Sequence, residues 1–155
     1  MRLVRATPFV VACVWGAVAV AVGDDKAAKF DPEKLLGKYV EIEGTKAGVK
    51  ADPDRLKGQF VTVTKDVFKI EGEKPEQTFE FAYKLDTTKN PVEIDLEIQS
   101  PDDLKGNKAS GIIALDGQTV KLCYHSTDAK DRPTKFESSE KNGYFLWTMK
   151  KVEKK

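Results

Sequence analysis

Cysteine and histidine are scarce in this chain of 155 residues, which contains two cysteines and one histidine. Cys13 lies in an apolar segment near the N-terminus, so Cys123 is the only cysteine of the remaining chain. A single cysteine excludes an internal disulfide there. Together with His125 it supplies at most two of the three or four ligands that a zinc site needs. We therefore expect no metal site, and a fold whose stability comes from its hydrophobic core.

Sequence patterns typical of catalysis and phosphate binding are also missing. The chain has no glycine-rich phosphate loop and no G-x-S-x-G or H-E-x-x-H pattern. Its formal net charge is +1, and removal of Arg2 and Arg5 with the N-terminal segment would make it 1 − 2 = −1. A charge this close to zero gives no reason to expect nucleic acid as a partner. We predict that the protein is not an enzyme and uses no cofactor.

The N-terminal 23 residues have the composition of a secretory signal peptide. Arg2 and Arg5 precede an apolar run from Phe9 to Val22, and Ala21 and Gly23 are small residues directly before Asp24. An anchoring helix is the alternative, but the run is shorter than the roughly 20 residues that a membrane span needs. Cleavage after Gly23 would leave 155 − 23 = 132 residues, the size of one domain. We expect a secreted or periplasmic protein with no membrane anchor after cleavage.

Lipid attachment at Cys13 is a further alternative for this segment. Few apolar residues precede Cys13 and a long apolar run follows it, so a lipid anchor would leave that run on the mature protein. We reject this alternative. Residues 24–34 are then a polar leader and the start of a short helix, 35–151 form the domain, and 152–155 form a basic tail.

Alternation of apolar and polar residues dominates the rest of the chain. This period of two is typical of strands with one buried face. It predicts eight strands near residues 38–43, 59–64, 67–71, 78–85, 92–98, 109–115, 119–125 and 144–151, with a further short strand near Phe136. Asp31-Pro32 and Asp52-Pro53 predict two short helical turns, because Asp caps a helix and Pro suits its first position.

Eight sequential antiparallel strands joined by short turns indicate an all-β fold with a short N-terminal helix. The Asp116-Gly117 pair between two alternating runs is a strong hairpin signal. A closed up-and-down barrel or a sandwich satisfies this pattern. Closure removes exposed sheet edges, so we favour the barrel and expect a monomer.

Several segments resemble an uncharacterised lipocalin-like domain family of secreted planctomycete proteins. Leu36-Gly37-Lys38-Tyr39 is similar to the G-x-W opening of lipocalins, and "YKLDTTKNPVEIDLEI", "GIIALDGQTVKLCY" and "DRPTKF" follow in order. The match runs from about Leu35 to Lys151. The resemblance implies a lipocalin-like barrel and an extracytoplasmic location, and it implies no reaction. Tyr39 stands where lipocalins carry tryptophan, and strict alternation places it on one face with Glu41, so either the strand has a bulge or Tyr39 is not the floor of the barrel.

Cys123 and His125 lie two residues apart on one strand, on the face opposite Leu122 and Tyr124. A cysteine nucleophile needs a base within hydrogen-bond reach, whereas side chains two apart on a strand are roughly 6–7 Å apart. We interpret the pair as non-catalytic strand residues that point outward or toward a neighbouring element.

Apolar and aromatic side chains of the strand faces are the candidate ligand-binding residues. They are Phe79, Phe81, Tyr83, Ile94, Leu96, Leu122, Tyr124 and Trp147. Barrels of this size sometimes hold one small apolar molecule, but eight strands enclose barely more than their own side chains. Two hypotheses therefore stay open, a binding protein for a small apolar ligand and a filled structural or interaction domain.

Arg132 and Tyr39 are candidate structural residues. Arg132 precedes Pro133, which favours an extended backbone, and its guanidinium could stack on an aromatic ring. It resembles the arginine that packs over the first-strand aromatic residue in lipocalins, and that resemblance implies Tyr39 as its partner.

Overall fold

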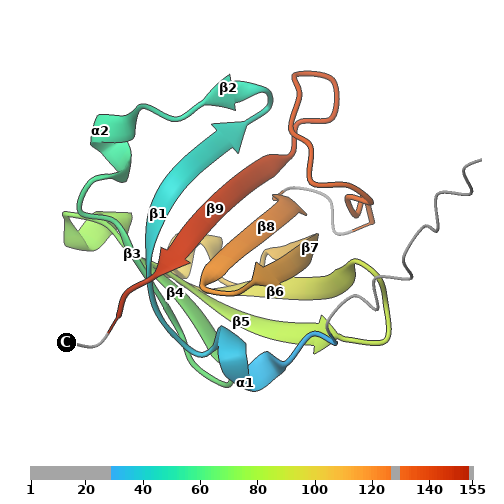
Figure 1. The fold of residues 1–155 in the computed structure, drawn as a ribbon. Helices are drawn as coiled ribbons and strands as arrows, with labels where there is room; N and C mark the ends of the chain where they lie inside the picture. Colours follow the sequence, from blue (N-terminus) through green and yellow to red (C-terminus); the bar gives the residue numbers. More distant parts are fainter. Residues whose placement is uncertain (1–28, 127–129, 154–155) are drawn as a thin grey trace, which may run out of the picture.

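The computed structural model describes residues 29–126 and 130–153 (Figure 1). The expected signal peptide at residues 1–23, residues 24–28 of the polar leader and the last two residues of the basic tail lie outside the described residues. None of the described helices is long and apolar enough to span a membrane.

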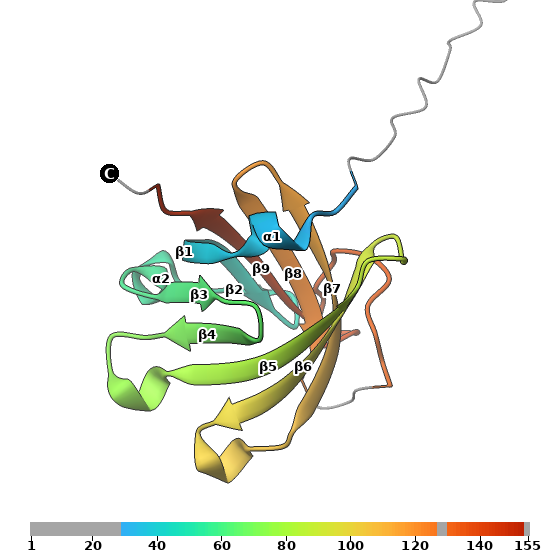
Figure 2. The same ribbon diagram turned by 90° about the horizontal axis from the view of Figure 1, so that it is seen from below.

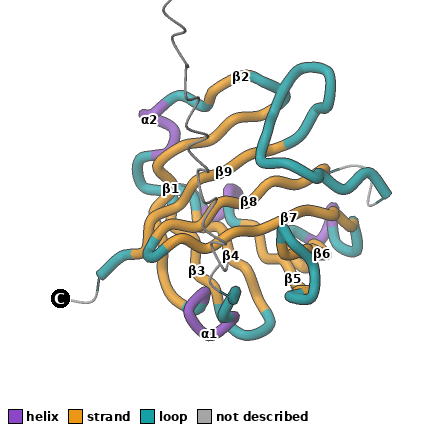
Figure 3. The backbone as a smooth tube through the Cα atoms, turned by 45° about the vertical axis from the view of Figure 1, so that its right-hand side comes forward, coloured by secondary structure: helices purple, strands orange, loops and turns teal. Residues whose placement is uncertain are grey.

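Strands make up about half of the described chain, and the few helices are short (Figure 3). The strands are β1 (Gly37–Lys46), β2 (Val49–Lys50), β3 (Phe60–Val63), β4 (Val67–Glu71), β5 (Phe79–Asp86), β6 (Val92–Ser100), β7 (Lys108–Asp116), β8 (Thr119–His125) and β9 (Phe145–Lys151). The helices are α1 (Pro32–Leu35) and α2 (Pro53–Leu56), with 3₁₀ turns η1 (Pro75–Gln77) and η2 (Asp102–Leu104).

The sheet closes on itself into an eight-stranded antiparallel barrel. Its order is β1-β3-β4-β5-β6-β7-β8-β9, each strand pairs with the next, and β9 pairs back with β1 from Tyr39–Lys151 to Lys46–Phe145. In Figure 1 the red β9 lies between β1 and β8 and completes the ring. The two-residue β2 extends the far end of β1 and is not one of the eight. The predicted all-β up-and-down barrel with a short N-terminal helix is confirmed.

Strand positions agree with the sequence pattern to within three residues at each end. Both predicted helical turns are present, and in each the side chain of the capping aspartate accepts a backbone N–H. Gly117 adopts a φ of +57° in the β7–β8 hairpin, a conformation that glycine reaches without strain. The prediction of a short strand near Phe136 is wrong. Phe136 lies in the loop between β8 and β9, where its neighbours find no strand partner among the described residues.

The barrel has two different ends. At the first, which we call the closed end, β1 begins and α1 precedes it (Figure 2). Leu35 of α1 is fully buried there, and the Tyr39 hydroxyl donates a 2.7 Å hydrogen bond to the Leu35 carbonyl. At the other, which we call the open end, β1 and β8 end and β5 and β9 begin. The hydrogen bond from Tyr39 to α1 and the burial of Leu35 show that α1 covers the closed end.

One hydrophobic core fills the barrel between these ends. Its buried members are Leu35, Tyr39, Val61, Val63, Phe68, Phe81, Val92, Ile94, Leu96, Ala109, Ile113, Val120, Leu122 and Met149. Tyr39 is fully buried among them, so it does belong to the floor of the barrel despite sharing its strand face with Glu41.

Candidate functional site

The eight candidate ligand-binding residues all lie in the inward-facing register of the barrel. Strand pairing places Phe81 opposite Ile98, Tyr83 opposite Leu96, and Leu122 opposite Trp147. Seven of the eight belong to the hydrophobic core or pack against it: Phe79, Phe81, Tyr83, Ile94, Leu96, Leu122 and Tyr124. The eighth, Trp147, follows the same alternation as the buried Met149 on β9. The structure therefore brings the set together around one interior.

Burial of the interior side chains differs from place to place in the barrel. Toward the closed end and the middle, residues such as Phe68, Ile94 and Ile113 are almost completely buried. Toward the open end, the inward-facing apolar side chains are only partly buried. They are Ile70, Phe79, Ile98, Tyr124, Phe145 and Trp147. Solvent thus reaches an apolar and aromatic lining at the open end, and this lining is the candidate binding site.

A carboxyl group lies inside this otherwise apolar barrel. Glu41 is 7% exposed and belongs to the inward face of β1 together with Tyr39, opposite Met149 of β9. A β-bulge follows it between Glu41 and Glu43, so Ile42 points outward and is 48% exposed. The strand therefore buries its glutamate and exposes its isoleucine, the reverse of the usual amphipathic pattern.

The Glu41 carboxyl has an incomplete set of hydrogen bonds. Its Oε2 atom is buried and has no hydrogen-bond partner among the described residues. Burial disfavours the charged form and raises the pKa of Glu41 from 4.5 to about 7. A buried polar group without a partner is costly, so Glu41 is a site where an added hydrogen-bonding group gains free energy.

The Trp147 side chain lies over a glycine on the neighbouring strand. Gly44 is opposite Trp147 in the β1–β9 pairing, and a Cβ atom on Gly44 would lie 2.1 Å from the indole ring. Only glycine leaves room for the ring at this position. The indole Nε1 is buried, and the Trp147 side chain hydrogen-bonds with that of Tyr124.

The Tyr124 hydroxyl is a third polar group at the open end, beside the Glu41 carboxyl and the Trp147 indole. Its ring stacks on Phe145 with centroids 5.1 Å apart and 11° between the planes. Burial raises the pKa of Tyr124 to about 12, the neighbouring Trp147 side chain opposes this shift, and the Glu41 carboxylate adds to it. The hydroxyl of Tyr124 is therefore neutral at physiological pH and close enough to Glu41 and Trp147 to interact with both.

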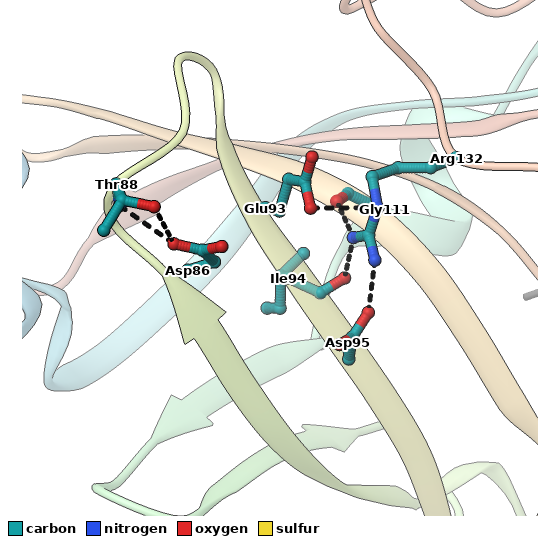
Figure 4. Close-up of polar contacts among 7 residues, drawn as sticks. All are labelled: Asp86, Thr88, Glu93, Ile94, Asp95, Gly111 and Arg132. Atoms are coloured by element: carbon teal, nitrogen blue, oxygen red, sulfur yellow. Dashed lines mark hydrogen bonds and ion pairs between the residues drawn. The ribbon is translucent and has the colours of Figure 1, made fainter.

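Arg132 is a structural residue on the outside of the barrel (Figure 4). Its Nη1 donates to the backbone carbonyls of Ile94 at 3.0 Å and Gly111 at 2.8 Å, and its Nη2 lies 2.5 Å from Asp95. Glu93 lies 3.4 Å from its Nε. The guanidinium thus fastens the segment after β8 to β6 and β7.

The expected stacking of Arg132 on Tyr39 is wrong. The cation near the Tyr39 ring is Lys151, whose Nζ lies 5.7 Å from the ring centroid and donates to the Lys34 carbonyl. Arg132 is instead held by backbone carbonyls and carboxylates of β6 and β7, and no pattern in the sequence connects Arg132 to those strands.

Cys123 lies on the outer face of β8 and is nevertheless fully buried. The segment between β8 and β9 covers it, and its thiol donates to the Glu137 carbonyl at 3.6 Å. Burial raises the pKa of Cys123 to about 11, which disfavours the thiolate that a nucleophile requires. His125 packs edge-to-face against Tyr144 with centroids 5.8 Å apart. The geometry agrees with the interpretation of both as strand residues that face a neighbouring element.

Glu41, Gly44 and Phe145 are the residues of this site that the sequence pattern did not select. The sequence did contain a signal for Glu41, because strict alternation places Glu41 on the same strand face as Tyr39. Among the residues that the structure describes, no group of three or more histidine, cysteine or carboxylate side chains could hold a metal ion.

Comparisons with known proteins found no relative of this chain. No family model, no curated protein and no solved structure matches this chain. The geometry of the barrel is therefore the basis for a functional conclusion.

Proposed function

We propose that this protein is an extracytoplasmic, lipocalin-like binding protein that holds one small apolar molecule in the open half of its barrel. The observation that supports this is the group of partly exposed aromatic side chains that face inward at the open end, Phe79, Tyr124, Phe145 and Trp147. Aromatic side chains that converge with part of their surface in solvent are typical of the linings of small apolar ligand sites.

Trp147 reports on this proposal because it lies in the inward-facing lining. In a chain carrying Trp15→Phe, Trp147 is the only tryptophan. We expect its emission to be blue-shifted, and to shift or quench saturably at one site per chain on titration with a panel of fatty acids, sterols and environment-sensitive dyes.

The control is the reverse variant, Trp147→Phe with Trp15 retained, in which the same ligands should leave the emission unchanged. If no ligand of the panel changes the Trp147 emission of the folded protein, the barrel is filled by its own side chains. The protein would then act through its outer surface, as a structural or interaction domain.

The extracytoplasmic location has its own test. Mass analysis of the protein secreted by its own host should show a chain that begins near Asp24, because Ala21 and Gly23 are the small residues that precede a cleavage site. A chain that retains Phe9 to Val22, or that carries a lipid on Cys13, would contradict this part of the proposal.

A further inference from the structure

A cleft of about 370 Å³ lies at the rim of the closed end, and we call it the rim cleft. Four segments that are distant in the sequence form it (Figure 2): the chain that leads into α1, the loop between β5 and β6, the end of β7 and the loop between β8 and β9. A volume of this size is within the range of small-molecule sites.

The inner wall of the rim cleft is apolar. Val92 of β6 and Ile113 of β7 are opposite each other in the strand pairing and are 8% and 1% exposed. Leu115 and Phe30 pack against the same core and remain partly exposed, and Phe136 is half-buried as well. Two aromatic rings and three aliphatic side chains therefore surround a space that suits an apolar or aromatic body.

The charge of the lining is positive only. Lys29 and Lys89 are exposed at its outer edge, and none of the twelve lining residues is acidic, in a chain with 25 Asp and Glu residues. Neither lysine forms an ion pair with another described residue. Both ammonium groups are thus available to a bound anion, and they disfavour a cation.

Asp86 directly precedes the β5–β6 loop and is engaged by that loop. Its Oδ1 accepts hydrogen bonds from the Thr88 amide and the Thr88 hydroxyl. These bonds are the largest cause of the lowered pKa of Asp86, and Lys89 contributes to it at longer range. The exposed side chains of Thr87 and Asn90 also line the rim cleft and can donate hydrogen bonds to an anion.

We propose that the rim cleft binds a small aromatic carboxylate. Its ring lies against Phe30 and Phe136, and its carboxylate pairs with Lys29 and Lys89 at the solvent edge. The rim cleft and the candidate site of the open end lie at opposite ends of the barrel, so this inference does not depend on the proposed barrel ligand.

Three naphthalene probes of different charge test the inference at pH 7 and low salt. They are 2-naphthoate, 2-naphthylmethanol and 2-naphthylmethylammonium. Backbone amide shifts of residues 87–90 in ¹H–¹⁵N spectra measure the affinity of the rim cleft, and the Trp147 indole N–H reports separately on the open end. We expect 2-naphthoate to bind about 5- to 20-fold more tightly than the alcohol, the range for two exposed charge pairs, and the cation to bind most weakly. Added salt should reduce this advantage, because both lysines are exposed.

Variants connect the preference to the lining. Lys89→Gln should remove most of the advantage of 2-naphthoate and leave the affinity for the alcohol unchanged. Phe136→Ala should weaken the binding of both probes by about 3- to 10-fold through loss of an aromatic contact. Lys105→Gln is the matched control, because Lys105 is an exposed lysine after η2, at the opposite end of the barrel.

The outcomes are distinct. Equal affinity of 2-naphthoate and the alcohol at residues 87–90, or an equal effect of Lys105→Gln and Lys89→Gln, would overturn the carboxylate assignment. Shifts at the Trp147 indole alone would overturn the rim cleft as a site and support the proposed function. Shifts at residues 87–90 alone, lost in Phe136→Ala, would support the rim cleft whatever the barrel binds. No shift at either place would overturn the inference.

Discussion

Phe68→Ala is expected to destabilise the folded protein by about 3–5 kcal/mol, the range for deleting a buried phenylalanine side chain. Phe68 is 1% exposed near the closed end, between Val63 and Phe81 of the neighbouring strands, and packs edge-to-face on Tyr83 with centroids 6.4 Å apart. Removal of its ring leaves a cavity that the surrounding strands cannot close. Urea unfolding monitored by circular dichroism measures the loss.

Phe79→Ala is the matched variant at the open end. Phe79 faces the same interior but is only partly buried, and it stacks on Phe81 with centroids 6.3 Å apart. Less of the Phe79 side chain leaves water on folding. We therefore expect Phe79→Ala to lower the free energy of unfolding by no more than about 2 kcal/mol. Equal costs for the two variants would show that the open end is packed as tightly as the closed end, which would favour a filled barrel.

Stability should fall as the pH rises through the titration of Glu41. Its pKa is raised from 4.5 to about 7 by burial, so between these values the folded state binds more protons than the unfolded state. The free energy of unfolding then decreases with increasing pH. The stabilisation is complete below pH 4.5 and lost above pH 7. A shift of 2.5 units corresponds to a decrease of about 3 kcal/mol between pH 4 and pH 8.

Comparison with Glu41→Gln isolates this effect from the other titrating groups. The difference in unfolding free energy between variant and wild type should change by about 3 kcal/mol over this range, in favour of the variant at high pH. The tyrosines that face Glu41 do not interfere, because burial raises the pKa of Tyr39 and of Tyr124 to about 12. The exposed Glu43→Gln should show no such change. A pH-independent difference for Glu41→Gln would mean that Glu41 is hydrated in the folded state.

A glutamate that destabilises the folded barrel above pH 7 is retained at a cost to folding, as functional sites often are.

The barrel itself follows from local information. Alternation in segments such as Val92–Ile98 marks strands because successive side chains point to opposite faces. Asp31-Pro32 starts a helix and Asp116-Gly117 turns a hairpin through conformational preferences of single residues. These signals depend on few neighbours in the chain, so the sequence alone determined the elements and their antiparallel order.

Which side chains form the site depends on pairing between strands that are distant in the sequence. Alternation states which residues share a face and not which face turns inward. On β1 it left open whether Tyr39 and Glu41 or the apolar Val40 and Ile42 face the interior. Pairing of β1 with β3 and β9, and the bulge after Glu41, turn Tyr39 and Glu41 into the interior. Likewise, the cover over Cys123 and the carbonyl partners of Arg132 come from distant segments. Only the closed barrel decides these contacts, because they join residues that no local preference brings together.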